Sequence, residues 1–131
     1  MSHQAYISED QTYIICEVTS DVTREVARDF NMTVDALSRR SHIKRFLIDV
    51  RSVKNVMGTG ENYNFTYKSM KAMELQRDVR VATLVGIKDS SHHFLETLAR
   101  NAGYNMRIFR DEGAALKWLL EADVKTSVDH D

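Results

Sequence analysis

The sequence predicts an α/β protein with a mostly parallel β-sheet and elements in the order ββαβαβαβα. Short runs of β-branched and apolar residues alternate with longer segments of helical spacing, and this alternation is typical of parallel strands joined by right-handed helical crossovers. The chain has 131 residues and contains no proline, which fits one compact domain and argues against proline-rich linkers. We therefore expect a single domain over residues 1–122, in which about four helices cover the sheet.

The N-terminal residues predict an antiparallel hairpin at the edge of the sheet. Tyr6-Ile7 and residues 12–18 are rich in β-branched and aromatic residues, and the polar stretch Glu9-Asp10-Gln11 separates them. Cys16, the only cysteine, lies in the second strand. We interpret it as a small buried hydrophobic residue rather than a reactive thiol.

The first helix is predicted from a cap and an apolar stripe. Ser20-Asp21 offers side-chain oxygens that would cap the helix, and Arg39-Arg40 suits its C-terminal end. The apolar residues at helical spacing are Val22, Val26, Phe30, Val34 and Leu37.

The middle of the chain predicts two buried strands around a second helix. The apolar run at 45–50 delivers Asp49 to the carboxyl end of a strand, and residues 79–85 form the next strand. Between them we expect a glycine-containing loop and a helix over residues 61–76.

The C-terminal part predicts two further helices around one strand. Asp89-Ser90-Ser91 should cap the first of these helices, and Gly103 should end it in a left-handed conformation. Residues 105–109 form a strand, and Asp111-Glu112 opens the last helix. Residues 123–131 show no periodicity and are predicted to be a flexible tail.

Composition excludes several classes of function. Eighteen basic and nineteen acidic residues give a net charge of −1, which argues against binding to nucleic acid or to an anionic membrane surface. The apolar runs are too short to span a membrane, and the first residues do not resemble a signal peptide. We therefore expect a cytoplasmic protein.

The sequence contains no signature of catalysis. Nucleophile-elbow, phosphate-loop and zincin motifs are missing, and the pair His92-His93 points in two directions on a helix, which disfavours a shared metal. Gly58-Thr59-Gly60 lacks the rest of a dinucleotide fingerprint. We therefore expect no enzyme activity, cofactor or metal site.

The second helix has two apolar stripes on a helical wheel. One contains Tyr63, Tyr67 and Met70, and the other contains Phe65, Ala72 and Leu75. One stripe should cover the sheet. The other should meet a neighbouring helix, a second copy of the chain or an apolar ligand.

Polar residues should gather where the parallel strands end. Four segments lie at or just after the ends of predicted strands: Ser20-Asp21, Asp49-Val50-Arg51-Ser52, Asp89-Ser90-Ser91 and Arg110-Asp111. Ligands of such sheets meet this edge. The alternative is that its Ser and Asp residues only cap helices. Thr59, just ahead of the second helix, is a candidate either for phosphorylation or for the helix cap.

Four segments carry a family resemblance: Lys44–Arg51, Glu61–Phe65, Ala99–Asp111 and Ala115–Leu119. They resemble the SpoIIAA-like family of small bacterial proteins, which is related to STAS domains, the fold of anti-sigma factor antagonists, and to the CRAL-TRIO lipid-transfer fold. The resemblance implies a STAS-like sheet covered by helices and used for binding rather than catalysis. Antagonists of this type carry an Asp-Ser-Ser-Gly-like motif with a phosphorylated serine, whereas Val56–Glu61 offers only the hydroxyl of Thr59.

These observations lead to two hypotheses of function. The first is a non-enzymatic, STAS-like regulatory module that acts through residues 49–63 and the first turns of the second helix. Its partner would be another protein, or a second copy of itself bound through the Tyr63/Tyr67 stripe or the Phe65 stripe. The second is a small carrier for an apolar or anionic ligand such as a lipid, with Tyr63, Tyr67 and Met70 lining a pocket and Arg51 and Arg110 holding an acidic head group. The candidate binding residues are Asp49, Arg51, Ser52, Thr59, Gly60, Tyr63, Tyr67, Met70 and Arg110.

Overall fold

A five-stranded mixed sheet forms the centre of the computed structural model, which describes residues 2–122. The predicted tail at 123–131 lies outside these residues. The strands are β1 (His3–Ile7), β2 (Ile14–Val18), β3 (Arg45–Asp49), β4 (Arg80–Leu84) and β5 (Asn105–Phe109). Their order in the sheet follows the sequence; β1 pairs antiparallel with β2, and every other pair is parallel. The predicted α/β fold and its antiparallel edge hairpin are therefore confirmed.

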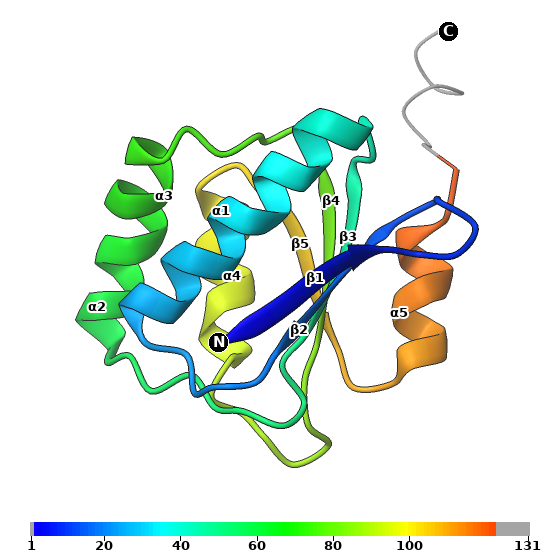
Figure 1. Cartoon of the computed structure of the whole chain (residues 1–131). Coiled ribbons are helices and arrows are strands. Elements are labelled where there is room, and N and C mark those ends of the chain that lie inside the picture. The colour runs from blue at the N-terminus through cyan, green and yellow to red at the C-terminus, as the bar shows by residue number, and fades with distance from the viewer. Residues whose placement is uncertain (1, 123–131) are drawn as a thin grey trace, which may run out of the picture.

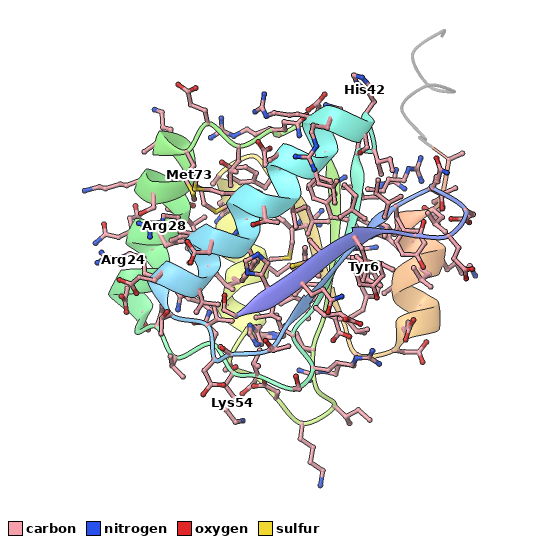
Figure 2. The ribbon with its side chains drawn as sticks, in the orientation of Figure 1. Tyr6, Arg24, Arg28, His42, Lys54 and Met73 are labelled. Atoms are coloured by element: carbon pink, nitrogen blue, oxygen red, sulfur yellow. The ribbon has the colours of Figure 1, made fainter. Side chains whose placement is uncertain are left out.

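The helices lie unequally on the two faces of the sheet (Figure 1). They are α1 (Arg24–Ser41), α2 (Thr59–Asn64), the π-helix η1 (Phe65–Ser69), α3 (Met70–Ala72), α4 (His93–Asn101) and α5 (Glu112–Leu119). The helices that connect consecutive parallel strands lie on one face, and α5 alone covers the other, as right-handed crossovers in a sheet of sequential strand order require. In Figure 2 His42, just before β3, lies at the amino ends of the parallel strands, and Lys54, just after β3, lies at their carboxyl ends.

Alternation along the strands divides the core in two. On β3, Phe46 and Ile48 belong to a large cluster beneath α1 and η1, whereas Leu47 belongs to a small cluster with α5. The small cluster is tightly closed, because Ala115 and Leu119 of α5 are completely buried against it. The large cluster and a third cluster, formed by Ala99, Tyr104 and Met106, together surround the cavity described below.

Two of the predicted helix caps are wrong. Thr23, not Ser20-Asp21, caps α1, and its hydroxyl accepts the Val26 N–H; the Asp21 carboxylate instead accepts the backbone N–H of Lys54 at 3.0 Å. α4 begins at His93, and the Asp89 carboxylate accepts the Ser91 N–H within the preceding turn. Both carboxylates therefore hold loops rather than helix ends.

Two other predicted helix-terminal signals, at Asp111 and Gly103, are confirmed. The Asp111 carboxylate accepts the Ala114 N–H at 2.8 Å and caps α5. Gly103 adopts a φ of 94° after α4, a conformation that glycine enters without strain.

Candidate ligand-binding site

The carboxyl edge of the sheet brings Asp49 and Arg51 together. Arg51 donates from Nη2 and Nε to the two Asp49 oxygens at 2.8 and 3.1 Å, and its backbone N–H donates to Asp49 Oδ1 at 3.0 Å. Burial alone would raise the pKa of Asp49, but the hydrogen bonds and charge of Arg51 outweigh it and hold that pKa below its usual value. Glu112 lies 3.5 Å from the same guanidinium, so Arg51 ties β3 to the start of α5.

Arg110 at the same edge is also occupied by the protein itself. Its Nη1 donates to the carbonyl oxygens of Gly86, Ile87 and Asp89. It therefore fastens the loop between β4 and α4. Arg51 and Arg110 therefore both have partners within the protein, and their predicted role in holding an acidic head group stays a prediction.

The loop after β3 is held by a buried pair of asparagines that the sequence analysis missed. Asn55 Nδ2 donates to Asn62 Oδ1 at 2.9 Å, and Asn55 Oδ1 accepts the Met57 N–H at 3.0 Å. Ser91 Oγ accepts the Asn55 N–H from the neighbouring loop. Asparagine side chains that bond backbone groups are a recognised way to shape such loops, so these two residues were a signal that could have been used.

Three of the predicted binding residues, among them the phosphorylation candidate Thr59, lie on the outside of this loop. Ser52, Thr59 and Gly60 are all exposed. Gly58 occupies the N-cap position of α2 and Thr59 is the first helical residue. The reading of Thr59 as the helix cap is therefore wrong, and its predicted phosphorylation stays a prediction.

Tyr63 and Tyr67 form an aromatic pair on the surface. Their ring centroids are 4.6 Å apart at an interplanar angle of 39°. Tyr63 is 53% exposed, and Tyr67 is half-buried. The two residues do share a face, as predicted, but that face is turned away from the interior.

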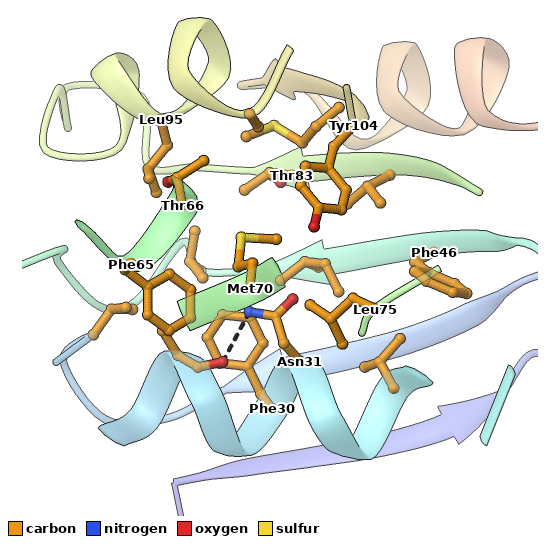
Figure 3. Close-up of a pocket in the computed structure, with 18 of the residues that line it drawn as sticks. Phe30, Asn31, Phe46, Phe65, Thr66, Met70, Leu75, Thr83, Leu95 and Tyr104 are labelled. Carbon is orange, nitrogen blue, oxygen red and sulfur yellow. Dashed lines mark hydrogen bonds between the residues drawn. The ribbon is translucent and has the colours of Figure 1, made fainter. Parts of the chain in front are cut away.

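Met70 does not belong to the tyrosine stripe, and this part of the helical-wheel prediction is wrong. The helix contains a π turn, in which the Met70 N–H donates to the Phe65 carbonyl five residues earlier. This turn holds one residue more than an α-helical turn and rotates everything after it. As a result Met70 lies on the same side as Phe65, and both line the interior cavity (Figure 3).

A cavity of about 130 Å³ lies between the sheet and the helices that cover one of its faces. Figure 3 shows Phe30 and Asn31 of α1 on one side and Leu95 of α4 on the other, with Phe65, Thr66 and Met70 between them. The sheet contributes apolar side chains from β3, β4 and β5, namely Ile48, Val81 and Ile108. The walls are therefore predominantly apolar and come from the core of the domain rather than from its edge.

No Lys or Arg from the described chain lines this cavity. Its ionisable neighbours are Asp35, His92 and Tyr104. The Asp35 carboxylate already accepts from Arg39 at 2.7 Å and from Gln76; although burial raises its pKa, these bonds prevail and the pKa is lowered. Burial is the main reason that the pKa of His92 is lowered, which keeps its ring neutral near pH 7. The cavity therefore offers no positive charge to an anion.

Cys16 is completely buried at the centre of β2, as predicted. Burial, with a smaller contribution from Glu17, raises the pKa of its thiol to about 12. The thiol is therefore protonated at neutral pH and unreactive in the native fold.

Residues 2–122 carry neither a metal nor a membrane signal. Within that range, no cluster of His, Cys, Asp and Glu side chains has the makings of a metal site. His92 is buried beside Asp89, with 3.7 Å between Nε2 and Oδ2, while His93 is exposed. No helix in the same range has the length and apolar character needed to cross a bilayer.

Comparison with known proteins bears on the fold alone. No family model matches the sequence, and no curated protein matches it. The chain is similar to the crystal structure of an uncharacterised DUF3478-family protein from Shewanella loihica PV-4, described as having a SpoIIAA-like fold. The two share 17% identity over 89% of this chain and 91% of the other, with a TM-score of 0.52. The protein therefore has a SpoIIAA-like fold, as the sequence resemblance implies.

Proposed function

We propose that the protein is a non-enzymatic binding module that holds a small, mainly apolar molecule in the cavity between its sheet and helices. The observation that supports the proposal is the cavity itself, with its volume of about 130 Å³ and its apolar walls. A cavity of roughly 150 Å³ with similar walls is large enough for a benzene-sized molecule. The site is therefore suited to a compact ligand rather than to a long lipid chain.

A void of this size is expensive for a small domain to keep empty. Cavities destabilise proteins by about 24 cal/mol per Å³, so 130 Å³ corresponds to about 3 kcal/mol. That is a large part of the 5–15 kcal/mol by which typical domains are stable. A ligand that fills the space would recover much of this loss, and we therefore interpret the cavity as a binding site rather than a packing defect.

The charges around the cavity narrow the ligand class. The second hypothesis assigned an acidic head group to Arg51 and Arg110, yet both arginines are bonded elsewhere at the sheet edge. The carboxylate nearest the cavity, Asp35, would repel an anion. We therefore propose an uncharged ligand.

The test is a titration of the full chain with toluene, followed by ligand-detected NMR and by the thermal unfolding midpoint. Saturable binding with a raised midpoint is the expected result. Ala99 of α4 lines the cavity, so Ala99→Leu should fill the space and abolish the binding while leaving the protein folded. Absence of saturable binding to the wild-type protein would show that the proposal is wrong.

A second candidate function is docking of a protein partner, or of a second copy, on the surface formed by residues 49–63 together with Tyr67, whose ring lies against that of Tyr63. One observation favours it: Val56 and Tyr63 expose 55% and 53% of their area beside a loop that the Asn55–Asn62 pair holds in place. If this surface mediates self-association, sedimentation of wild-type protein should show a dimer and Tyr67→Glu a folded monomer. A wild-type monomer at high concentration would exclude the self-association form of this candidate.

A further inference from the structure

Three hydroxyl groups interrupt the apolar walls of the cavity. They belong to Thr66 on η1, Thr83 on β4 and Tyr104 just before β5, whose side chains Figure 3 labels around the same space. All three residues are almost completely buried, with exposed fractions of 2%, 8% and 7%. The sequence positions are far apart, so the fold has gathered them.

None of these hydroxyls has a hydrogen-bond partner among residues 2–122. Every side-chain polar atom that is fully closed off from a water-sized probe does have a partner in that part of the chain. The three hydroxyls therefore keep some accessible surface, and all three residues line the cavity. In Figure 3 the Tyr104 hydroxyl points inward from the end of its ring.

Elsewhere in the same core, buried polar groups are satisfied by the protein. Ser38 Oγ, for example, donates to the Ile43 carbonyl and accepts from Gln76 Nε2 at 3.0 Å. Asn62 is bonded to Asn55 and to backbone carbonyls. Proteins rarely bury hydroxyls without partners, because the desolvation is not recovered. The concentration of such groups around one cavity therefore indicates that a bound molecule completes their hydrogen bonding.

Thr83 shows the point most clearly. Its register neighbours on the adjacent strands are Ile48 and Ile108, and all three face the cavity. A β-branched residue suits a strand, but valine has the same shape without a polar atom. The hydroxyl of Thr83 is therefore not needed for the packing of the sheet. It can instead form a hydrogen bond to a molecule bound in the cavity.

We infer that the ligand is an uncharged, compact apolar molecule with one hydroxyl or carbonyl group, and that Thr66, Thr83 and Tyr104 hydrogen-bond that group. The inference rests on the proposed function and names the ligand class of the same site. Hydroxyls both donate and accept, so the site suits an alcohol, a phenol or a ketone. A face of Tyr104 is covered by the Arg77 guanidinium, 4.9 Å from the ring centroid, which helps to keep the ring oriented toward the cavity.

The experiment compares two probes that differ by one hydroxyl, toluene and p-cresol. For each protein the measured quantity is the ratio of the toluene Kd to the p-cresol Kd, obtained by calorimetric titration of the full chain. Thr83→Val and Tyr104→Phe remove a hydroxyl and preserve shape, so both variants should fold. We expect each to lower the ratio by about three- to tenfold, the size of one net hydrogen bond, with little change in toluene affinity.

Tyr6→Phe is the matched control, because Tyr6 lies on β1 far from the cavity walls and donates only to Glu17. Its ratio should equal that of the wild-type protein. If toluene binds and the ratio is the same in all four proteins, the assigned polar contacts are wrong while the proposed function stands. If neither probe binds the wild-type protein, the proposed function fails and the inference fails with it.

Discussion

His92 is almost completely enclosed between the loop after β3 and the start of α4. Its Nε2 lies 3.3 Å from the Val53 carbonyl oxygen and therefore carries the proton of that hydrogen bond. Burial lowers the pKa of His92; the Val53 carbonyl and Asp89 act in the opposite direction without reversing the shift. Protonation of this ring is therefore coupled to opening of the structure around the cavity.

This coupling predicts how stability depends on pH. Because the pKa of His92 is lower in the folded than in the unfolded state, the unfolded chain binds the extra proton first as the pH falls below about 6.5. The free energy of unfolding should therefore decrease between pH 6.5 and 5, by at most about 1.4 kcal/mol per pH unit from this group, and be nearly constant above pH 7.5. Urea unfolding at several pH values between 5 and 7.5 measures this dependence of the free energy of unfolding on pH.

His92→Gln should flatten the slope, and the neighbouring exposed His93→Gln should retain it. The four carboxylates with lowered pKa values, Asp10, Asp35, Asp49 and Asp89, have the same sign of effect. Their contributions are present above about pH 4 and are lost at lower pH, so the window from 6.5 to 5 isolates the histidine. An unchanged slope in His92→Gln would contradict the assignment.

At the scale of elements, the π turn of η1 determines which residues face the cavity. The residue types alone predicted an ordinary helix, because a π turn does not alter composition or the apolar count. A regular wheel puts Met70 with Tyr63 and Tyr67, whereas the extra residue in the turn places it with Phe65. The predicted shared face of Tyr63 and Tyr67 therefore holds, and Leu75 lines the cavity with Phe65 as their common stripe predicted, whereas the placement of Met70 with the tyrosines fails.

Deletion of Lys68 tests this account. Lys68 is an exposed residue inside the π turn, and removing one residue converts the i→i+5 hydrogen bond between Phe65 and Met70 to the ordinary i→i+4 pattern. Phe65 and Met70 should stay on one face, so the deletion should cost less than about 2 kcal/mol. Circular dichroism and urea unfolding measure the result.

The matched control is deletion of the exposed Arg28 from the regular helix α1. It turns the residues on one side of the deletion by about 100° relative to the other and removes Phe30 and Val34 from the core, so this protein should not fold. Equal effects of the two deletions would show that η1 does not accommodate an extra residue in the way described.

At the scale of the whole molecule, the order of the strands explains where the sequence analysis succeeded. The alternation of apolar runs and helical segments specifies a parallel sheet because crossover chirality leaves few topologies, and the carboxyl end of β3 does deliver Asp49 to the edge. In doubly wound sheets the strand order reverses at one point, and the ligand-binding crevice forms at the carboxyl ends of the strands on either side of that point. Here the order runs from β1 to β5 without reversal, and the polar residues of the edge bond one another.

The cavity could not be predicted from the sequence in the same way. It depends on the separation of α1, η1 and α4 from the sheet, which is set by side-chain packing between segments distant in the chain. Thr83 was a partial signal, since it interrupts the apolar run of β4. The role of its hydroxyl becomes visible only when the structure shows that the register neighbours, Ile48 and Ile108, offer it no side-chain hydrogen-bond partner.

The two faces of the sheet should respond differently to the same substitution. Ala99 borders the cavity, whereas Ala115 of α5 is completely buried in the closed cluster on the opposite face. Ala115→Leu should lower the free energy of unfolding by about 1–3 kcal/mol through overpacking. Ala99→Leu should change it by less than about 1 kcal/mol, because the new side chain enters existing space. A large loss in Ala99→Leu would mean that the cavity is not available to additional atoms.

The position of Cys16 allows its thiol to report both on opening of the fold and on ligand binding in the cavity. The single thiol lies at the centre of β2, fully buried and protonated, so it meets a soluble disulfide reagent only when the sheet separates. Its labelling rate at fixed reagent concentration therefore counts opening events without a fluorophore or an engineered residue. A molecule that occupies the cavity should slow the labelling by the factor 1 + [L]/Kd, which turns a buried, chemically silent side chain into a direct measure of ligand affinity in the unmodified protein.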